Sequence, residues 1–214
     1  MKRNALAAIL ATCLLFASPH RSVAEPQVPV IVALGDSLTA GLGLPQDQAF
    51  PAQLEAALKA RGVEARVVNA GVSGDTAAAG LARLDWALPE DTSAVIIELG
   101  ANDALQGLPP EGTKKALAAI VERLQAKGLP ILLAGMEAPR NLGKDYVDAF
   151  GAIYPDLAAR YGLILYPFFL DGAALNESLM QKDGLHPNAE GVAVIVERIL
   201  PNVEELLARA GNGQ

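Results

Sequence analysis

The stretch that decides the fold is VALGDSLTAG, residues 32–41. An apolar run stops here at Gly-Asp-Ser (residues 35–37), where small polar residues follow it directly. The run is short and rich in valine and isoleucine, which indicates a buried strand over Val28–Leu34. A strand that ends on an acid and a hydroxyl is followed either by an ordinary turn or by a nucleophile held in a fixed position.

Further along the chain, strand-like apolar runs alternate with segments of helical periodicity. The predicted strands are Val28–Leu34, Ala65–Val68, Ala94–Leu99, Pro130–Ala134 and Leu163–Tyr166. The predicted helices are Phe50–Arg61, Thr76–Leu88, Thr113–Lys127, Lys144–Tyr161 and Asn188–Ala208. Strand followed by helix, five times over, predicts one α/β domain in which helices cover both faces of a parallel sheet.

The N-terminus is typical of a secretory signal peptide. Two basic residues, Lys2 and Arg3, precede an apolar run over Ala5–Ala17, and a Ser-Val-Ala sequence supplies the small residues of a cleavage site. The apolar run is about 13 residues long, shorter than the roughly 20 that a membrane-spanning helix needs. We predict a signal peptide over residues 1–24, one exported domain over residues 25–214, and no membrane-spanning segment after cleavage.

Removal of that peptide changes the chemistry that the mature chain can carry. The only cysteine, Cys13, would be lost, and of the two histidines, His20 and His186, only His186 would remain. Without a thiol there is no disulfide and no cysteine ligand for a metal. Three basic residues and no acidic one would also be removed, so the net charge changes from −7 to −10. This charge disfavours nucleic acid and anionic lipid as partners.

Four loops rich in glycine and polar residues follow predicted strands. They are GDS at residues 35–37, NAGVSGDT at residues 69–76, GAND at residues 100–103 and DGLHP at residues 183–187. In an open parallel sheet, ligands bind outside the carboxyl ends of the strands. We therefore expect the four loops to gather at one edge of the sheet and to form the functional site there.

These loops contain the residue types that acyl transfer by a serine requires. Ser37 follows the first strand, His186 is the only imidazole of the mature chain, and Asp183 lies three residues before it. An Asp-x-x-His turn can bring the carboxylate to one ring nitrogen while the other nitrogen faces the serine hydroxyl. The backbone N–H groups of Ser37 and Gly74 and the side-chain amide of Asn102 are candidate donors to an oxyanion.

The ordered set GDSL, NAGVSGDT, GAND and DGLHP resembles the four sequence blocks of the SGNH (GDSL) hydrolase family. Within that family the chain is similar to the periplasmic subgroup of thioesterases, lysophospholipases and arylesterases, over approximately residues 30–200. The resemblance implies a three-layer α/β/α fold with a flavodoxin-like, five-stranded parallel sheet of strand order 2-1-3-4-5.

The resemblance also implies a role for each candidate residue. Ser37 is the expected nucleophile, with His186 as its base and Asp183 as the group that orients the base. Ser37, Gly74 and Asn102 are the expected oxyanion hole. The implied substrates are small acyl esters and thioesters, hydrolysed without cofactor or metal, and we expect a monomer in the periplasm or outside the cell.

Several apolar residues beside these blocks are candidates for a substrate groove, by resemblance to the subgroup and by their place next to the site. They are Leu105, Leu108, Pro109, Pro110 and Leu185. Trp86, in contrast, lies within a predicted helix, and we expect it to pack on a helix face.

Three further carboxylates, Asp36, Asp75 and Asp103, lie in the same blocks. We interpret them as acceptors for backbone N–H groups that brace the loops. A metal cluster is disfavoured, because the single imidazole is engaged by Asp183 and no thiolate is available.

Two other functions remain open on the same fold. One is a non-catalytic module that binds lipid or carbohydrate, since a fold alone does not specify a function. The other is a deacetylase of decorated polysaccharides. The Gly-x-Ser-x-Gly elbow of α/β-hydrolases is absent from the sequence, and so are the phosphate-binding loop and the dinucleotide-binding glycine motif.

Overall fold

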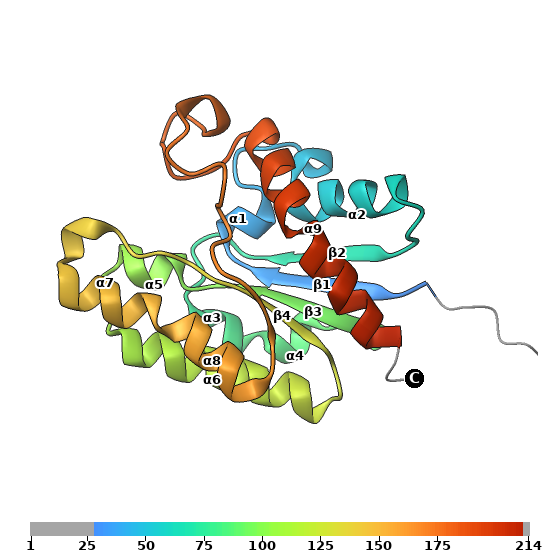
Figure 1. Ribbon diagram of the computed structural model, residues 1–214, viewed down its shortest axis with the longest axis horizontal. Coiled ribbons are helices and arrows are strands. Elements are labelled where there is room, and N and C mark those ends of the chain that lie inside the picture. The colour runs from blue at the N-terminus through green and yellow to red at the C-terminus, as the bar shows by residue number, and fades with distance from the viewer. Residues whose placement is uncertain (1–27, 212–214) are drawn as a thin grey trace, which may run out of the picture.

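A parallel sheet forms the middle layer of the computed structural model, which describes residues 28–211 (Figure 1). Its strands are β1 (Val30–Gly35), β2 (Arg66–Gly71), β3 (Thr92–Glu98), β4 (Ile131–Ala134) and β5 (Ile164–Tyr166). All four strand pairings are parallel, and the strand order is β2-β1-β3-β4-β5. The predicted fold class and strand order are confirmed, whereas the predicted signal peptide lies outside the described residues.

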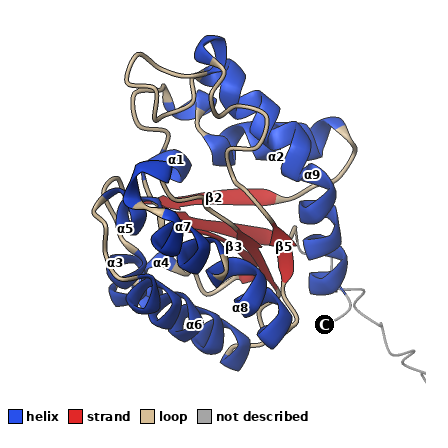
Figure 2. Ribbon diagram, turned by 60° about the vertical axis from the view of Figure 1, so that its left-hand side comes forward, coloured by secondary structure: helices blue, strands red, loops and turns tan. Residues whose placement is uncertain are grey.

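Helices cover both faces of this sheet (Figures 1 and 2). One face is covered by α2 (Phe50–Ala60) and α9 (Ala189–Gly211), which pack against each other. The other face is covered by α3 (Ala77–Ala82), α4 (Leu84–Ala87), α6 (Pro110–Ala126) and α8 (Ile153–Tyr161). The remaining helices are α1 (Ser37–Ala40), α5 (Ala101–Leu105), α7 (Lys144–Gly151) and the 3₁₀ turns η1 (Gln46–Gln48), η2 (Arg140–Leu142) and η3 (Glu177–Leu179).

Two helices that the sequence predicts as continuous are each broken in the structure. The segment Lys144–Tyr161 divides at Ala152 into α7 and α8. Pro155 has no N–H to donate to the carbonyl of Gly151, so the backbone ladder is interrupted at this point. The segment Thr76–Leu88 divides at Arg83, whose backbone has left the helical conformation. Thr76 caps the first of the two pieces, because its hydroxyl accepts from the N–H of Ala79.

One packing prediction is wrong. Trp86 on α4 is 92% exposed rather than packed on a helix face. Its helix has only four residues and follows the break at Arg83, so the periodicity of one long helix does not predict which way its side chains point.

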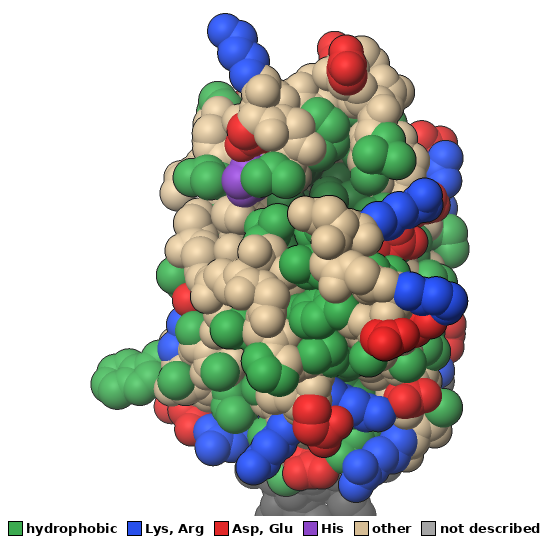
Figure 3. Space-filling model, turned by 90° about the vertical axis from the view of Figure 1, so that its left-hand side faces the viewer, with side chains coloured by type: hydrophobic (Ala, Val, Ile, Leu, Met, Phe, Trp, Pro, Cys, Tyr) green, Lys and Arg blue, Asp and Glu red, His purple; other side chains and the backbone are tan. Residues whose placement is uncertain are grey.

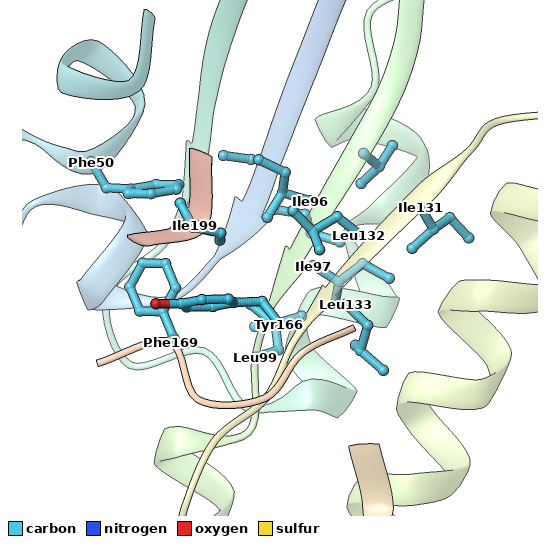
Figure 4. Close-up of a cluster of buried hydrophobic side chains, with 14 of the residues drawn as sticks. Phe50, Ile96, Ile97, Leu99, Ile131, Leu132, Leu133, Tyr166, Phe169 and Ile199 are labelled. Carbon is cyan, nitrogen blue, oxygen red and sulfur yellow. The ribbon is translucent and has the colours of Figure 1, made fainter. Parts of the chain in front are cut away.

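The core lies on both faces of the sheet. Strands β1 and β4 consist entirely of buried residues, as expected for central parallel strands covered by helices on both sides. Figure 4 shows side chains of β3, β4 and β5 packed with aromatic and aliphatic residues of α2, α9 and the segment after β5. This core fixes the ends of β1 and β3, where the candidate loops begin.

Candidate active site

The structure brings Ser37, His186 and Asp183 into one hydrogen-bonded chain at the carboxyl edge of the sheet. His186 Nε2 lies 2.9 Å from Ser37 Oγ, and His186 Nδ1 lies 2.6 Å from Asp183 Oδ2. Ser37 is 9% exposed and lines the cavity at this edge. This is the arrangement of nucleophile, base and orienting carboxylate that activates a serine.

The turn between β1 and α1 explains why the sequence reads Gly-Asp-Ser. A Cβ on Gly35 would lie 2.1 Å from Thr39 Oγ1, so only glycine fits where the strand meets the helix. The carboxylate of Asp36 accepts from the N–H of Leu38 at 3.0 Å and caps α1. Ser37 is therefore the first residue of a short helix, where its backbone is fixed by the cap and by the buried strand before it.

The turn that carries His186 is held mostly by its own residues. Asp183 Oδ1 accepts from the N–H groups of Leu185 at 2.9 Å and His186 at 3.0 Å, while Oδ2 contacts the ring. The N–H of Gln181 donates to the carbonyl of His186 at 2.7 Å and closes the turn. The hydrogen bond from His186 and those from the two N–H groups hold the pKa of Asp183 at about 2. The anionic carboxylate favours the tautomer with a proton on Nδ1, which leaves Nε2 free to accept from Ser37.

The expected oxyanion donors lie around the same cavity, but they are not equally free. The N–H groups of Ser37 and Gly74 donate to no acceptor among residues 28–211. Gly74 has a φ of +89°, a conformation that favours glycine. The amide nitrogen of Asn102 already donates to Asp36 Oδ2 and to the carbonyl of Asp75, both at 3.0 Å. Asn102 therefore ties two loops together, and an oxyanion would have to share one of its amide hydrogens.

The carboxylates of Asp36 and Asp103 brace the loops as predicted. Asp103 accepts from the N–H of Ala77 and from Thr113 Oγ1, both at 2.8 Å. Asp75 differs, because its carboxylate pairs with the guanidinium of Arg83. Burial raises the pKa of Asp36 to about 6. Within the described part of the chain, no three His, Cys, Asp or Glu side chains form a cluster that could hold a metal.

One polar residue beneath the site was not anticipated from the sequence. Glu98 is 1% exposed at the end of β3, where its Oε2 accepts from Thr39 Oγ1 at 2.7 Å. Its Oε1 has no hydrogen-bond partner within the described structure, and burial raises the pKa of this carboxyl well above its usual range. The available signal was an acid that interrupts the apolar run AVIIEL, residues 94–99.

A mostly apolar cavity of about 480 Å³ opens beside Ser37 and His186. Figure 3 shows this face, where hydrophobic side chains lie on either side of the histidine drawn in purple. Of the predicted groove residues, Leu105 and Leu185 line the cavity, whereas Leu108, Pro109 and Pro110 do not. Pro109 and Pro110 line a separate depression near α6 and α7.

Sequence reasoning missed the opposite wall of the cavity, which is formed by the segments that follow β4 and β5. Its apolar residues are Met136, Ala138, Pro139, Phe168, Leu170 and Leu175. The signal that could have found them is that these segments also begin at the carboxyl ends of strands, although the wall residues themselves lie outside the four polar blocks.

Comparison with known proteins agrees with this geometry. Residues 33–194 match the model of the GDSL-like Lipase/Acylhydrolase family. The chain belongs to this family. It is 40% identical to Esterase TesA of Pseudomonas aeruginosa, over 83% of this chain and 89% of that protein. It is 37% identical to the Thioesterase 1/protease 1/lysophospholipase L1 of Escherichia coli, over 83% of this chain and 84% of that protein.

A solved structure gives the same result for the fold. The crystal structure of AlinE4, an SGNH-hydrolase family esterase, superposes with a TM-score of 0.72 at 46% identity. The match covers 86% of this chain and 98% of that one. The protein is accordingly an SGNH-type hydrolase of ester or thioester bonds.

Proposed function

We propose that the protein is an exported serine esterase that hydrolyses acyl esters and thioesters through an acyl-enzyme intermediate on Ser37. The observation that carries this proposal is the hydrogen-bonded chain from Ser37 through His186 to Asp183 at the mouth of an apolar cavity. A binding module would have no need of an activated hydroxyl at this point, so the geometry favours catalysis over binding alone.

In the first half of the reaction, Ser37 Oγ attacks the carbonyl carbon while its proton passes to His186 Nε2. Asp183 holds the ring in position and stabilises the imidazolium that forms. The negative charge moves to the carbonyl oxygen, where the N–H groups of Ser37 and Gly74 and the amide of Asn102 are the proposed donors. The tetrahedral intermediate then collapses, and the alcohol or thiol leaves with the proton from His186.

In the second half, a water molecule gives its proton to His186 Nε2 and attacks the acyl carbon. The bond to Ser37 Oγ breaks, and the serine takes back the proton from His186. The products are the carboxylic acid and the free enzyme, and His186 acts as base and acid in turn.

The cavity supports an acyl chain rather than a sugar as the group bound beside Ser37. Its walls include Leu38, Leu105, Met136, Phe168 and Leu170, and the burial of apolar surface is the main source of binding free energy that they offer. An acetylated sugar would place hydroxyl groups against these walls without partners. We therefore place deacetylation of polysaccharides second.

The place of action also belongs to the proposal. The signal pattern over residues 1–24 supports export, and the resemblance to the periplasmic subgroup supports the periplasm. Among residues 28–211, no helix is both long and apolar enough to cross a membrane. We propose that residues 25–214 act as a single-domain monomer on small-molecule esters.

The testing experiment measures hydrolysis of p-nitrophenyl esters with acyl chains from C2 to C16. We expect turnover by the mature wild type with a maximum between C4 and C10, and a loss of kcat of about 10⁶ in Ser37→Ala. A fluorophosphonate probe should label the wild type and not Ser37→Ala. Ser73→Ala is the matched control: Ser73 lines the same cavity, but His186 pairs with Ser37, so this variant should keep the label.

Two outcomes would contradict the proposal. A folded wild type that neither takes the label nor hydrolyses any of these esters is not a serine esterase. A clear preference for acetylated glycans over the C4 to C10 esters would favour the deacetylase.

A further inference from the structure

Arg83 stands apart from the other paired arginines of the described structure. Its guanidinium Nε donates to Asp75 Oδ2 at 2.5 Å, and a terminal nitrogen donates to the carbonyl of Gly35 at 2.9 Å. The side chains of Arg83 and Asp75 are 23% and 13% exposed. The arginine pairs at Arg61, Arg66, Arg198 and Arg209 are about half exposed, where an ion pair contributes little to stability.

The two contacts of Arg83 lie on the two segments that carry the backbone donors of the proposed oxyanion hole. Asp75 directly follows Gly74, and Gly35 lies two residues before Ser37. One guanidinium therefore joins the turn that presents the Gly74 N–H to the strand end that presents the Ser37 N–H.

Asn102 and one backbone hydrogen bond also join these two segments. The amide of Asn102 donates to Asp36 Oδ2 and to the carbonyl of Asp75, both at 3.0 Å. The N–H of Asp75 donates to the carbonyl of Val72 at 3.1 Å, which closes the turn on itself. The N–H of Val72 donates to the carbonyl of Gly35 at 3.0 Å, and β2 ends before that point, at Gly71. A Cβ on Gly74 would meet no atom within 4 Å, so there is open space on that side of the residue.

Arg83 also stands at the break between two helices. Arg83 is the residue at which α3 ends and α4 begins, and its backbone φ of −103° and ψ of 4° are not those of a helix. The planar fork of a guanidinium can reach a carboxylate and a carbonyl at once, which the single ammonium of a lysine does less well.

We propose that Arg83 is a positioning residue for the oxyanion hole. It contacts no substrate, and it acts by fixing the separation between the N–H groups of Gly74 and Ser37. Such donors stabilise the transition state only when they stand 2.7–3.1 Å from the position that the oxyanion will occupy. Displacement of one donor therefore lowers kcat and leaves ground-state binding, and so KM, nearly unchanged. This inference rests on the proposed function.

The test compares Arg83→Ala, Arg83→Lys and the control Arg123→Ala, whose arginine makes a 3.9 Å contact with Asp85 on the surface. Rates are measured on a p-nitrophenyl ester and divided by the number of sites that a fluorophosphonate labels at completion. We expect kcat of Arg83→Ala to fall about 10- to 100-fold, somewhat less than the loss of a whole donor, with KM within about threefold. Arg83→Lys should fall less, added guanidinium ion should restore part of the activity of Arg83→Ala, and Arg123→Ala should match the wild type.

A second measurement separates positioning from a purely structural role. An alkylboronic acid forms a tetrahedral adduct with the serine and resembles the transition state, so its affinity should fall in Arg83→Ala by the same factor as kcat/KM. A structural role would instead lower the melting temperature while labelled sites kept their wild-type kcat and boronate affinity.

The outcomes are distinguishable. If the wild type hydrolyses esters and Arg83→Ala does so with an unchanged kcat per site, or with a change in KM alone, Arg83 is not a positioning residue. If the wild type itself is inert, the proposed function fails and this inference falls with it. If Arg83→Ala does not fold, Arg83→Lys is tested in its place. Its kcat per labelled site and its boronate affinity are then compared with those of the wild type.

Discussion

The two halves of the site are held in different ways. Ser37 and Asp36 stand at the end of a buried strand, and Asp36 is completely buried. Asp183 and His186 lie in a surface turn between β5 and α9, where the Asp183 side chain is 46% exposed. The first half is fixed by the core of the protein, and the second by hydrogen bonds that Asp183 makes to residues two and three positions along the chain.

The two halves also differ in the number of helices, strands and loops to which side-chain hydrogen bonds tie them. Contacts to Glu98 and Asn102 tie the serine half to β3 and α5, and Arg83 adds a tie to the turn after β2. The histidine turn has one side-chain tie to the loop after α1, from Gln181 Nε2 to the carbonyl of Leu42 at 2.8 Å. A change in the histidine half should therefore alter the chemistry and spare the fold, whereas a change in the serine half should alter both.

The largest effect that tests this contrast is expected in Asp183→Asn. An asparagine oxygen can still accept from the N–H groups of Leu185 and His186, so the turn should keep its shape, but the charge that orients His186 is lost. We expect kcat to fall about 10⁴-fold. Because the folded-state pKa of Asp183 is lowered to about 2, its contribution to stability is present above about pH 4 and is lost only below that.

Melting curves at pH 5 to 8 check the prediction that the turn keeps its shape in Asp183→Asn. Asp183→Asn should melt within about 3 °C of the wild type, as should the control Asp171→Asn, which removes an exposed partner of Arg198. A large loss of stability in Asp183→Asn would show that the histidine turn is not self-contained.

Asn102→Ala should show the opposite pattern, with a smaller loss of rate and a measurable loss of stability. The rate should fall about 10²- to 10³-fold, as for the loss of one oxyanion donor. Asp36 Oδ2 and the carbonyl of Asp75 would each lose a hydrogen bond near the base of the site, at about 1–3 kcal/mol for a buried group left unsatisfied. Kinetics and thermal denaturation of the same preparation test both parts, and an unchanged melting temperature would refute the proposed tie between the loops.

The same contrast explains what the sequence could and could not predict. The Asp-x-x-His turn is local, so spacing alone was enough to predict that Asp183 and His186 meet. The strand pattern then predicted that their loop would reach Ser37, because strand ends share one edge of the sheet. Arg83 pairs with Asp75 eight positions before it, but its second contact and those of Glu98 join residues 48 to 62 positions apart. No local sequence pattern predicts such distant contacts.

The cavity shows the same limit. Leu185 lies within the DGLHP block and Leu105 lies two residues after GAND, and both line the cavity. Leu108 and Pro109 are only three and four residues beyond Leu105, yet they do not line it. Side-chain direction in a loop is set by how the loop packs, which hydrophobic periodicity does not encode.

The smallest effect on rate, and the sharpest test of the buried half, is expected in Glu98→Gln. Glutamine keeps the oxygen that accepts from Thr39 and the N–H of Asp36, so kcat should stay within about threefold of the wild type. The amide cannot ionise, however. Burial raises the folded-state pKa of Glu98, so the folded protein holds its proton more tightly than the unfolded chain does.

The sign of the pH effect follows from that pKa. The stabilisation is fully present below about pH 4.3, the ordinary pKa of a glutamate, and is lost as the pH rises toward the raised folded-state value. The melting temperatures of wild type and Glu98→Gln should therefore diverge between pH 4 and pH 8. The melting temperature of the variant should rise by several degrees relative to that of the wild type as the pH increases. Parallel curves would mean that Glu98 is already ionised in the folded protein. The two halves of the site thus respond to pH with opposite signs, since acid weakens the contribution of Asp183 and base weakens that of Glu98.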